Sequence, residues 1–176
     1  MISRDTFNVE EWAQIVSAPA AIGALVVTAD PSGPIGLIGE FRAMMDSMKS
    51  YIEAHAGDSA LMAALRDYVS SQPTEEEQAR LKEWAEQQQE QMKANRPKSP
   101  EELQQHIRDV VGAALGTLQG KGATAEDMTS FRSLMVSVAE ATANASKEGG
   151  FLGIGGTLVS DKEQSILAQI RQELAG

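Results

Sequence analysis

Two carboxylates on either side of a glycine-bearing segment have the chemistry to bind a hard cation. Asp30 closes a run of small apolar residues, and Glu40 comes after Gly33, Gly36 and Gly39. Carboxylate and main-chain carbonyl oxygens are the ligands that Ca²⁺ and Mg²⁺ prefer. The Asp-Pro-Ser-Gly sequence at Asp30 is also typical of a turn that ends a helix, with Glu40 an ordinary charged residue on the next helix. The residues favour the turn, and the cation site is the alternative.

The two histidines offer little for catalysis. A diiron helix pair needs a glutamate three residues before each histidine, but Ile52 precedes His55 and Leu103 precedes His106. Glu102 and His106 share one helical face, either as half of a metal site or as an exposed pair. His55 lies at an expected helix end, where an imidazolium interacts favourably with the helix dipole. Because cysteine and a Gly-x-Ser-x-Gly motif are also absent, the sequence favours a non-catalytic protein without a cofactor.

A group of methionines is the remaining candidate for ligand binding. Met44, Met45 and Met48, with Phe41 and Ile52, have the flexible apolar side chains that line adaptable grooves. At helical spacing, such residues more often pack in a core. Core packing is therefore the interpretation that the spacing favours.

One glycine pattern occurs twice. Residues 33–39 and residues 150–156 both read glycine, any residue, branched aliphatic, glycine, branched aliphatic, any residue, glycine. Each copy follows an expected helix of small residues, and each precedes a helix with a glutamate near its start, Glu40 or Glu163. The glycines concerned are Gly33, Gly36, Gly39, Gly150, Gly153 and Gly156.

These glycines suit either of two local structures. In a helix, glycines three residues apart let a second helix approach closely. In a loop, they permit positive φ angles and can present backbone N–H groups to an anion. Pro34 favours a helix start in the first copy, and the additional glycines favour a loop in the second. Neither copy has the strand-to-helix setting of a dinucleotide site or a Walker lysine, so phosphate binding is disfavoured.

The repeat suggests how the chain is organised. We interpret residues 8–70 and 99–175 as two related halves of a single domain. Residues 74–96 join them as a polar helix, because Leu81 and Trp84 are followed by an unbroken run of glutamine and glutamate. Such a helix has little to bury, so it is expected to project from the halves or to bridge them.

Helix start signals recur along the chain, whereas strand signals are weak. Asn8 is followed by Glu11, and Ser17 is followed by Pro19, which predicts one helix from Asn8 and another from Ser17. Further capping signals stand at Asp58, Thr74, Ser99, Thr124 and Ser160. Apolar residues recur every three or four positions after most of these signals. The chain is therefore predicted to be all-α, a bundle of about seven or eight helices.

Charge and hydropathy exclude some partners. The net charge is −10, which repels nucleic acids and disfavours docking on anionic lipid. Residues 13–29 are apolar but include Gln14 and Ser17, and they fall short of the ~20 residues of a membrane span, so we expect a buried helix and no stable membrane insertion. The N-terminus lacks the apolar core of a signal peptide, and the expected location is cytoplasmic.

Part of the chain repeats an order of features that is typical of one known family. Residues 24–30 end in an Ala-Asp pair, which a glycine-bearing segment and Glu40 follow. Residues 138–141 and 159–163 repeat this order around the second glycine segment. The pattern resembles the tellurite-resistance TerB-like family of helical proteins, and it is also similar to a related bacterial helical family of uncharacterised role.

The resemblance implies an all-helical fold built from pseudo-twofold halves. It also implies a divalent cation associated with acidic loops, for which the matching positions are Asp30, Glu40 and Glu163. The second copy has Ser146 where the family's pattern has an aspartate.

Together these observations favour a helical interaction module whose partner is a second copy of itself or another protein. The alternative is a cation-binding, stress-related protein of the TerB-like kind. A helical enzyme is the third hypothesis.

Overall fold

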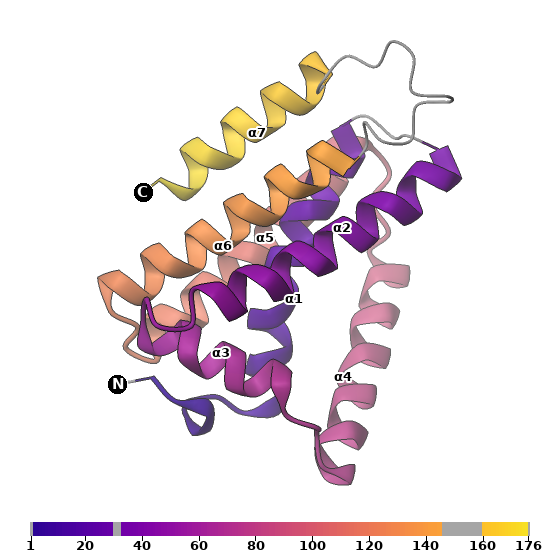
Figure 1. Cartoon of the computed structure of the whole chain (residues 1–176). Coiled ribbons are helices and arrows are strands. Elements are labelled where there is room, and N and C mark those ends of the chain that lie inside the picture. The colour runs from indigo at the N-terminus through magenta and orange to yellow at the C-terminus, as the bar shows by residue number, and fades with distance from the viewer. Residues whose placement is uncertain (1, 30–32, 146–159, 176) are drawn as a thin grey trace.

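The chain folds into a bundle of helices (Figure 1). The structure is a computed structural model that describes residues 2–29, 33–145 and 160–175, with only the backbone for residues 33–36. In these ranges it contains seven α-helices, one short 3-10 helix and no strand, which confirms the all-α prediction. The elements are η1 (Arg4–Thr6), α1 (Val9–Ala29), α2 (Gly33–Ala54), α3 (Ala60–Ser70), α4 (Glu75–Ala94), α5 (Pro100–Gly120), α6 (Ala125–Ala145) and α7 (Asp161–Leu174).

Most of the predicted capping residues begin a helix. The Thr74 hydroxyl accepts the N–H of Glu77 at 3.2 Å, and the Glu77 carboxylate accepts the N–H of Thr74 at 2.7 Å, which forms a capping box. Asn8 forms the same reciprocal pair with Glu11, and Ser160 does so with Glu163. Each such cap typically contributes about 1 kcal/mol.

The predicted helix start at Ser17 is wrong. α1 runs without a break through this position, and Pro19 lies inside it. The Ser17 hydroxyl donates to the carbonyl of Gln14 within the same helix instead of capping a new one. A proline in a helix interior costs about 3 kcal/mol, so packing on both sides of it must outweigh that cost. Ile15 and Ile22, one turn before and one turn after, are both buried in the core.

α1 is the central helix of the bundle. It contacts α2, α4, α5, α6 and α7, and α6 in turn contacts α1, α2, α3 and α7. By length and composition alone α1 could also cross a membrane, but half of its most apolar stretch is buried inside the bundle. The largest fully buried side chains come from several helices and form one core; they include Ile15, Leu25, Leu118, Phe131, Leu134 and Met135.

The two pairs α1–α2 and α6–α7 pack across each other. α2 lies along α6, and α7 contacts α1 as well as α6 (Figure 1). The duplication stays a prediction, because the second glycine segment, residues 150–156, lies outside the described residues.

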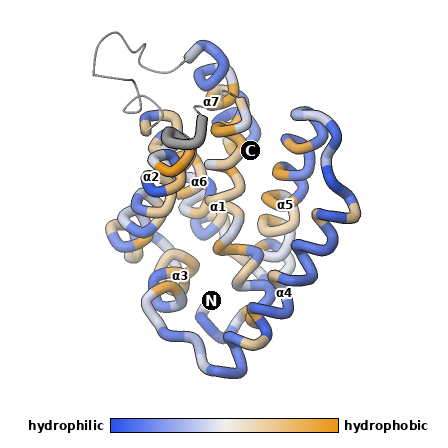
Figure 2. Tube along the Cα trace, turned by 90° about the vertical axis from the view of Figure 1, so that its right-hand side faces the viewer, coloured by the Kyte–Doolittle hydropathy of each residue, from blue (hydrophilic) through white to orange (hydrophobic). Residues whose placement is uncertain are grey.

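The polar helix α4 is attached at one end. It has no buried residue, and Figure 2 shows hydrophilic residues along most of its length. Arg80 donates to both carboxylate oxygens of Glu10 on α1, at 2.9 and 2.6 Å. This ion pair and the adjoining contacts of Arg4 fix the first half of α4 to the N-terminal segment.

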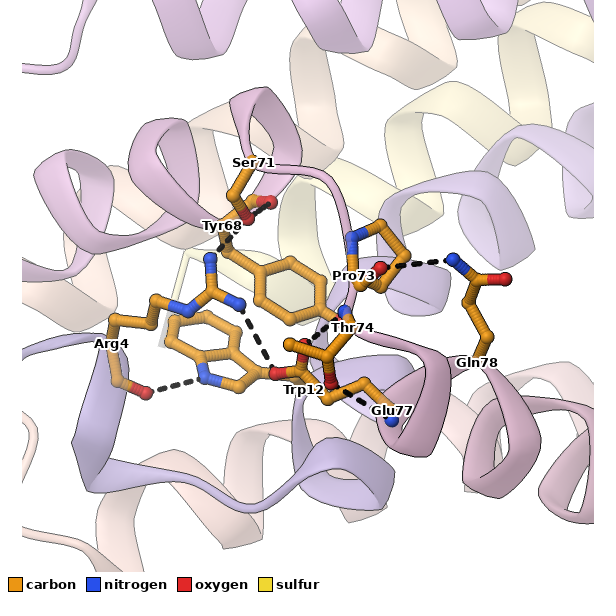
Figure 3. A network of polar contacts seen from close by, with 8 residues as sticks. All are labelled: Arg4, Trp12, Tyr68, Ser71, Pro73, Thr74, Glu77 and Gln78. Carbon is orange, nitrogen blue, oxygen red and sulfur yellow. Dashed lines mark hydrogen bonds and ion pairs between the residues drawn. The ribbon is translucent and has the colours of Figure 1, made fainter.

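An aromatic cluster supports that attachment (Figure 3). The indole N–H of Trp12 donates to the carbonyl of Arg4 at 2.8 Å, and the indole ring stacks on Tyr68 with centroids 4.9 Å apart. The Arg4 guanidinium lies 5.5 Å from the centre of the Tyr68 ring, donates to Ser71 and donates to Glu77 of α4 at 3.1 Å. η1, α1, α3 and α4 therefore meet at one junction.

Candidate interaction surface

α2 carries an apolar outer face. Four large apolar side chains on it are exposed, which we call the α2 face: Leu37 (50% exposed), Ile38 (74%), Phe41 (59%) and Met45 (39%). Their spacing places them on one side of the helix. Outside this helix, the described residues contain two further exposed large apolar side chains, Val69 and Met92, on different helices.

An adjoining stripe of α2 packs into the bundle. It consists of Glu40, Met44, Met48 and Ile52, which follow each other at four-residue spacing and are all buried. The methionine prediction is therefore correct for Met44 and Met48 and wrong for Met45, which is exposed with Phe41. α2 thus buries a glutamate and exposes a phenylalanine and an isoleucine, so part of its apolar surface is not covered by the bundle.

A glycine on α1 lies against the buried side of α2. If Gly23 had a Cβ atom, that atom would lie 2.9 Å from Cγ of Met44, closer still to its sulfur, and 3.0 Å from the Thr142 hydroxyl on α6. α1, α2 and α6 thus converge at Gly23, where a Cβ atom would force the Met44 side chain to move. Met44 is buried at this point, whereas the neighbouring Met45 and Phe41 are exposed.

The predicted glycine segments are partly described. α2 begins at Gly33, so the first copy is helical rather than a loop, and Gly36 and Gly39 lie inside that helix. A Cβ atom on Gly39 would meet nothing within 4 Å, so Gly39 serves no close approach. In the second copy, Gly150, Gly153 and Gly156 lie outside the described residues. The glycine that does permit close packing, Gly23, belongs to neither copy.

Two of the three predicted cation ligands, Glu40 and Glu163, lie in the described part of the chain. Glu40 is 1% exposed, and neither of its carboxylate oxygens has a hydrogen-bond partner there. Glu163 is buried at the start of α7, where one oxygen accepts the N–H of Ser160 at 2.9 Å. Asp30 lies outside the described residues. The described residues contain no group of three or more histidines or carboxylates that could hold a metal ion.

The two histidines have other surroundings. Nδ1 of His55 lies 2.7 Å from the Asp58 carboxylate, and the imidazole stacks on Tyr51. Glu102 does not pair with His106, because its carboxylate accepts the backbone N–H of Lys98 at 2.6 Å. Neither arrangement brings catalytic groups together.

One buried carboxylate was not anticipated as a structural link. Asp127 accepts the backbone N–H of Leu61 at 2.8 Å, which joins the start of α6 to the start of α3. Its other oxygen accepts both the N–H and the hydroxyl of Thr124, at 2.9 Å each. Burial raises the pKa of Asp127, but these hydrogen bonds outweigh burial and hold the pKa below its ordinary value. The sequence signal was the spacing of Thr124 and Asp127, which is that of a capping pair.

Comparison with models of known protein families, with curated proteins and with solved structures finds no match. The resemblance to the TerB-like family stays a prediction.

Proposed function

We propose that this protein is a non-catalytic helical module that associates with a second copy of itself through the α2 face. The observation that carries the proposal is the gathering of Leu37, Ile38, Phe41 and Met45 on one side of a single helix. Contiguous exposed apolar surface of this kind typically marks an interaction site.

The charges on α2 favour a second copy over an oppositely charged partner. Arg42 lies 3.7 Å from Asp46, and Lys49 lies 4.0 Å from Glu53, so the exposed charges of the helix balance. The whole chain has a net charge of −10. A basic partner would be attracted to the acidic surfaces elsewhere, whereas two acidic copies meet with least repulsion on a neutral face.

The spacing of the apolar residues is self-complementary. Phe41 lies midway between Leu37 and Met45, about one helical turn from each. If two α2 helices pack antiparallel about a twofold axis at Phe41, Leu37 of one copy lies opposite Met45 of the other. Both members of the pair then bury the same residues, as a closed dimer requires.

Sedimentation over a range of protein concentrations tests this function. The native chain should form a dimer, and Phe41→Asp should sediment as a monomer, because an aspartate at the centre of the interface would be buried without a partner. Val69→Asp is the matched control, since Val69 is an exposed apolar residue on α3 (39%). A native chain that stays monomeric at all concentrations, or a Phe41→Asp variant that still dimerises, would contradict the proposal.

Binding of a divalent cation is the second candidate function, and the burial of Glu40 supports it. A buried carboxylate without a hydrogen-bond partner is costly, and a cation would offset that cost. Calorimetric titration with Ca²⁺ and with Zn²⁺ should then give stoichiometric heat with the native chain and with Glu53→Gln, but none with Glu40→Gln. Absence of heat from the native chain would eliminate this candidate.

A further inference from the structure

A cleft of about 670 Å³ lies where α4 ends and α5 begins. Its apolar walls include Met92 from the last turns of α4, Pro97 from the connection, and Pro100 and Leu103 from the first turn of α5. The two prolines restrict the backbone of the connection, so this wall is stiff. The volume lies within the range of small-molecule binding sites.

Three cations line the same cleft: Lys93, Arg96 and Lys98. Their side chains form no hydrogen bond or ion pair with any residue that the structure describes. Every other lysine and arginine in the described part of the chain has a partner. Among the cations that the structure describes, those without partners are thus confined to one stretch of six residues.

Nearby carboxylates do not neutralise these cations. No acidic residue is among those that line the cleft. The carboxylate of Glu102, on the first turn of α5, accepts the backbone N–H of Lys98. The backbone N–H of Glu102 donates to the hydroxyl of Ser99. Like charges that line one cleft repel each other, and a bound anion would reduce that repulsion.

We propose that this cleft binds a small amphiphilic anion, a carboxylate or phosphate head group on an apolar body. The head group would lie among Lys93, Arg96 and Lys98, which are exposed and able to reach it. The apolar body would cover Met92, whose side chain is otherwise 37% exposed, and Leu103. Lysine and arginine stems also contribute apolar contact while their charged ends stay at the rim. This site is separate from the α2 face and does not depend on dimerisation.

Calorimetric titration of the full chain with sodium octanoate and with octyl phosphate tests the proposal, with 1-octanol as the uncharged probe. Both anions should bind at one site per chain, and their relative affinity identifies the preferred head group. 1-Octanol should bind at least about tenfold more weakly, because a charge-assisted hydrogen bond contributes about that much. A variant that combines Lys93→Gln, Arg96→Gln and Lys98→Gln should lose a similar factor for both anions.

A second triple variant serves as the control. Arg42→Gln, Lys49→Gln and Lys82→Gln together change the net charge by the same amount at exposed positions away from the cleft, and this variant should bind octanoate like the native chain. Leu103→Ser should weaken the binding of both anions and of 1-octanol, since it removes an apolar side chain from the wall of the cleft.

Three results would overturn the proposal: equal binding of octanoate and 1-octanol, equal loss of binding in the two triple variants, or no binding of either anion. Sedimentation with phosphatidylglycerol vesicles completes the test. If the chain binds vesicles through Lys93, Arg96 and Lys98 but binds neither free anion, the cleft docks on membranes and the small-molecule proposal is wrong.

Discussion

The side chain of Met44 on α2 occupies the space that a Cβ atom on Gly23 of α1 would need. α1, α2 and α6 approach each other closely at this point, because the Cβ atom would also lie 3.0 Å from the Thr142 hydroxyl on α6. Met44 is buried here, whereas Phe41 and Met45, on the adjoining side of α2, are exposed.

Gly23→Ala should destabilise the fold. Alanine favours a helix over glycine by up to about 1 kcal/mol, but here its methyl group would displace Met44 and press on Thr142. Overpacking of this kind costs about 1–3 kcal/mol, so after the gain in helix propensity the free energy of unfolding in urea should fall by up to about 2 kcal/mol. Gly116→Ala on α5 is the control, because a Cβ atom there would meet nothing within 4 Å, and this variant should be more stable than the native chain. A stabilised Gly23→Ala variant would show that α1 and α2 do not approach so closely.

Asp127 should make the free energy of unfolding depend on pH under acidic conditions. Hydrogen bonds hold its pKa in the folded chain below its ordinary value. The unfolded chain therefore binds the proton more readily, so the contribution of Asp127 is present above about pH 4 and is lost as the pH falls through the lowered pKa. Urea unfolding at pH 7 and pH 3 should show a smaller acid loss for Asp127→Asn than for the native chain. Asp67→Asn, at an exposed position on α3, should keep the native pH dependence; equal profiles for all three chains would rule out this role.

The junction of η1, α1, α3 and α4 should depend on its aromatic core more than on its ion pairs. Trp12 is 2% exposed and stacks on Tyr68, so Trp12→Ala should lower the free energy of unfolding by about 3–5 kcal/mol. The pair of Arg80 with Glu10 is exposed, so Arg80→Ala should lower the free energy of unfolding much less than Trp12→Ala does, and less still at high salt. Chemical denaturation of both variants measures the difference. A larger loss for Arg80→Ala would mean that charge, not packing, attaches α4.

Local features of the fold could be predicted from the sequence because local chemistry determines them. The capping pairs at Asn8, Thr74 and Ser160 need only residues three positions apart, and each of them begins a helix. The predicted helix start at Ser17 is wrong, because the local preference of Pro19 for a helix start is outweighed by the packing of α1 on both sides of it.

The candidate sites depend on neighbours that are distant in sequence, so the sequence predicted them poorly. Met44 continues to Met48 and Ile52 at four-residue spacing, whereas Met45 continues to Lys49 and Glu53, so the pattern within α2 indicates which methionine is buried. The close approach of Met44 to Gly23 on another helix could not be predicted from that pattern. The cleft at Lys93, Arg96 and Lys98 did leave a signal, a group of cations between polar and proline-rich stretches of an acidic chain. The sequence does not show which cations have partners. The structure does, because the other described cations all have partners.

Disulfide formation between engineered cysteines tests the antiparallel α2 dimer most directly, because the chain has no cysteine of its own. Under mild oxidation, Phe41→Cys should form a covalent dimer, since the two positions meet at the twofold axis. Leu37→Cys alone should not, because its two copies would lie about 12 Å apart along the helices, too far for a disulfide. A mixture of Leu37→Cys and Met45→Cys chains should give the covalent heterodimer. If Leu37→Cys dimerises alone, or if Phe41→Cys links no better than Val69→Cys, the two α2 helices do not pack in this way and the central claim is wrong.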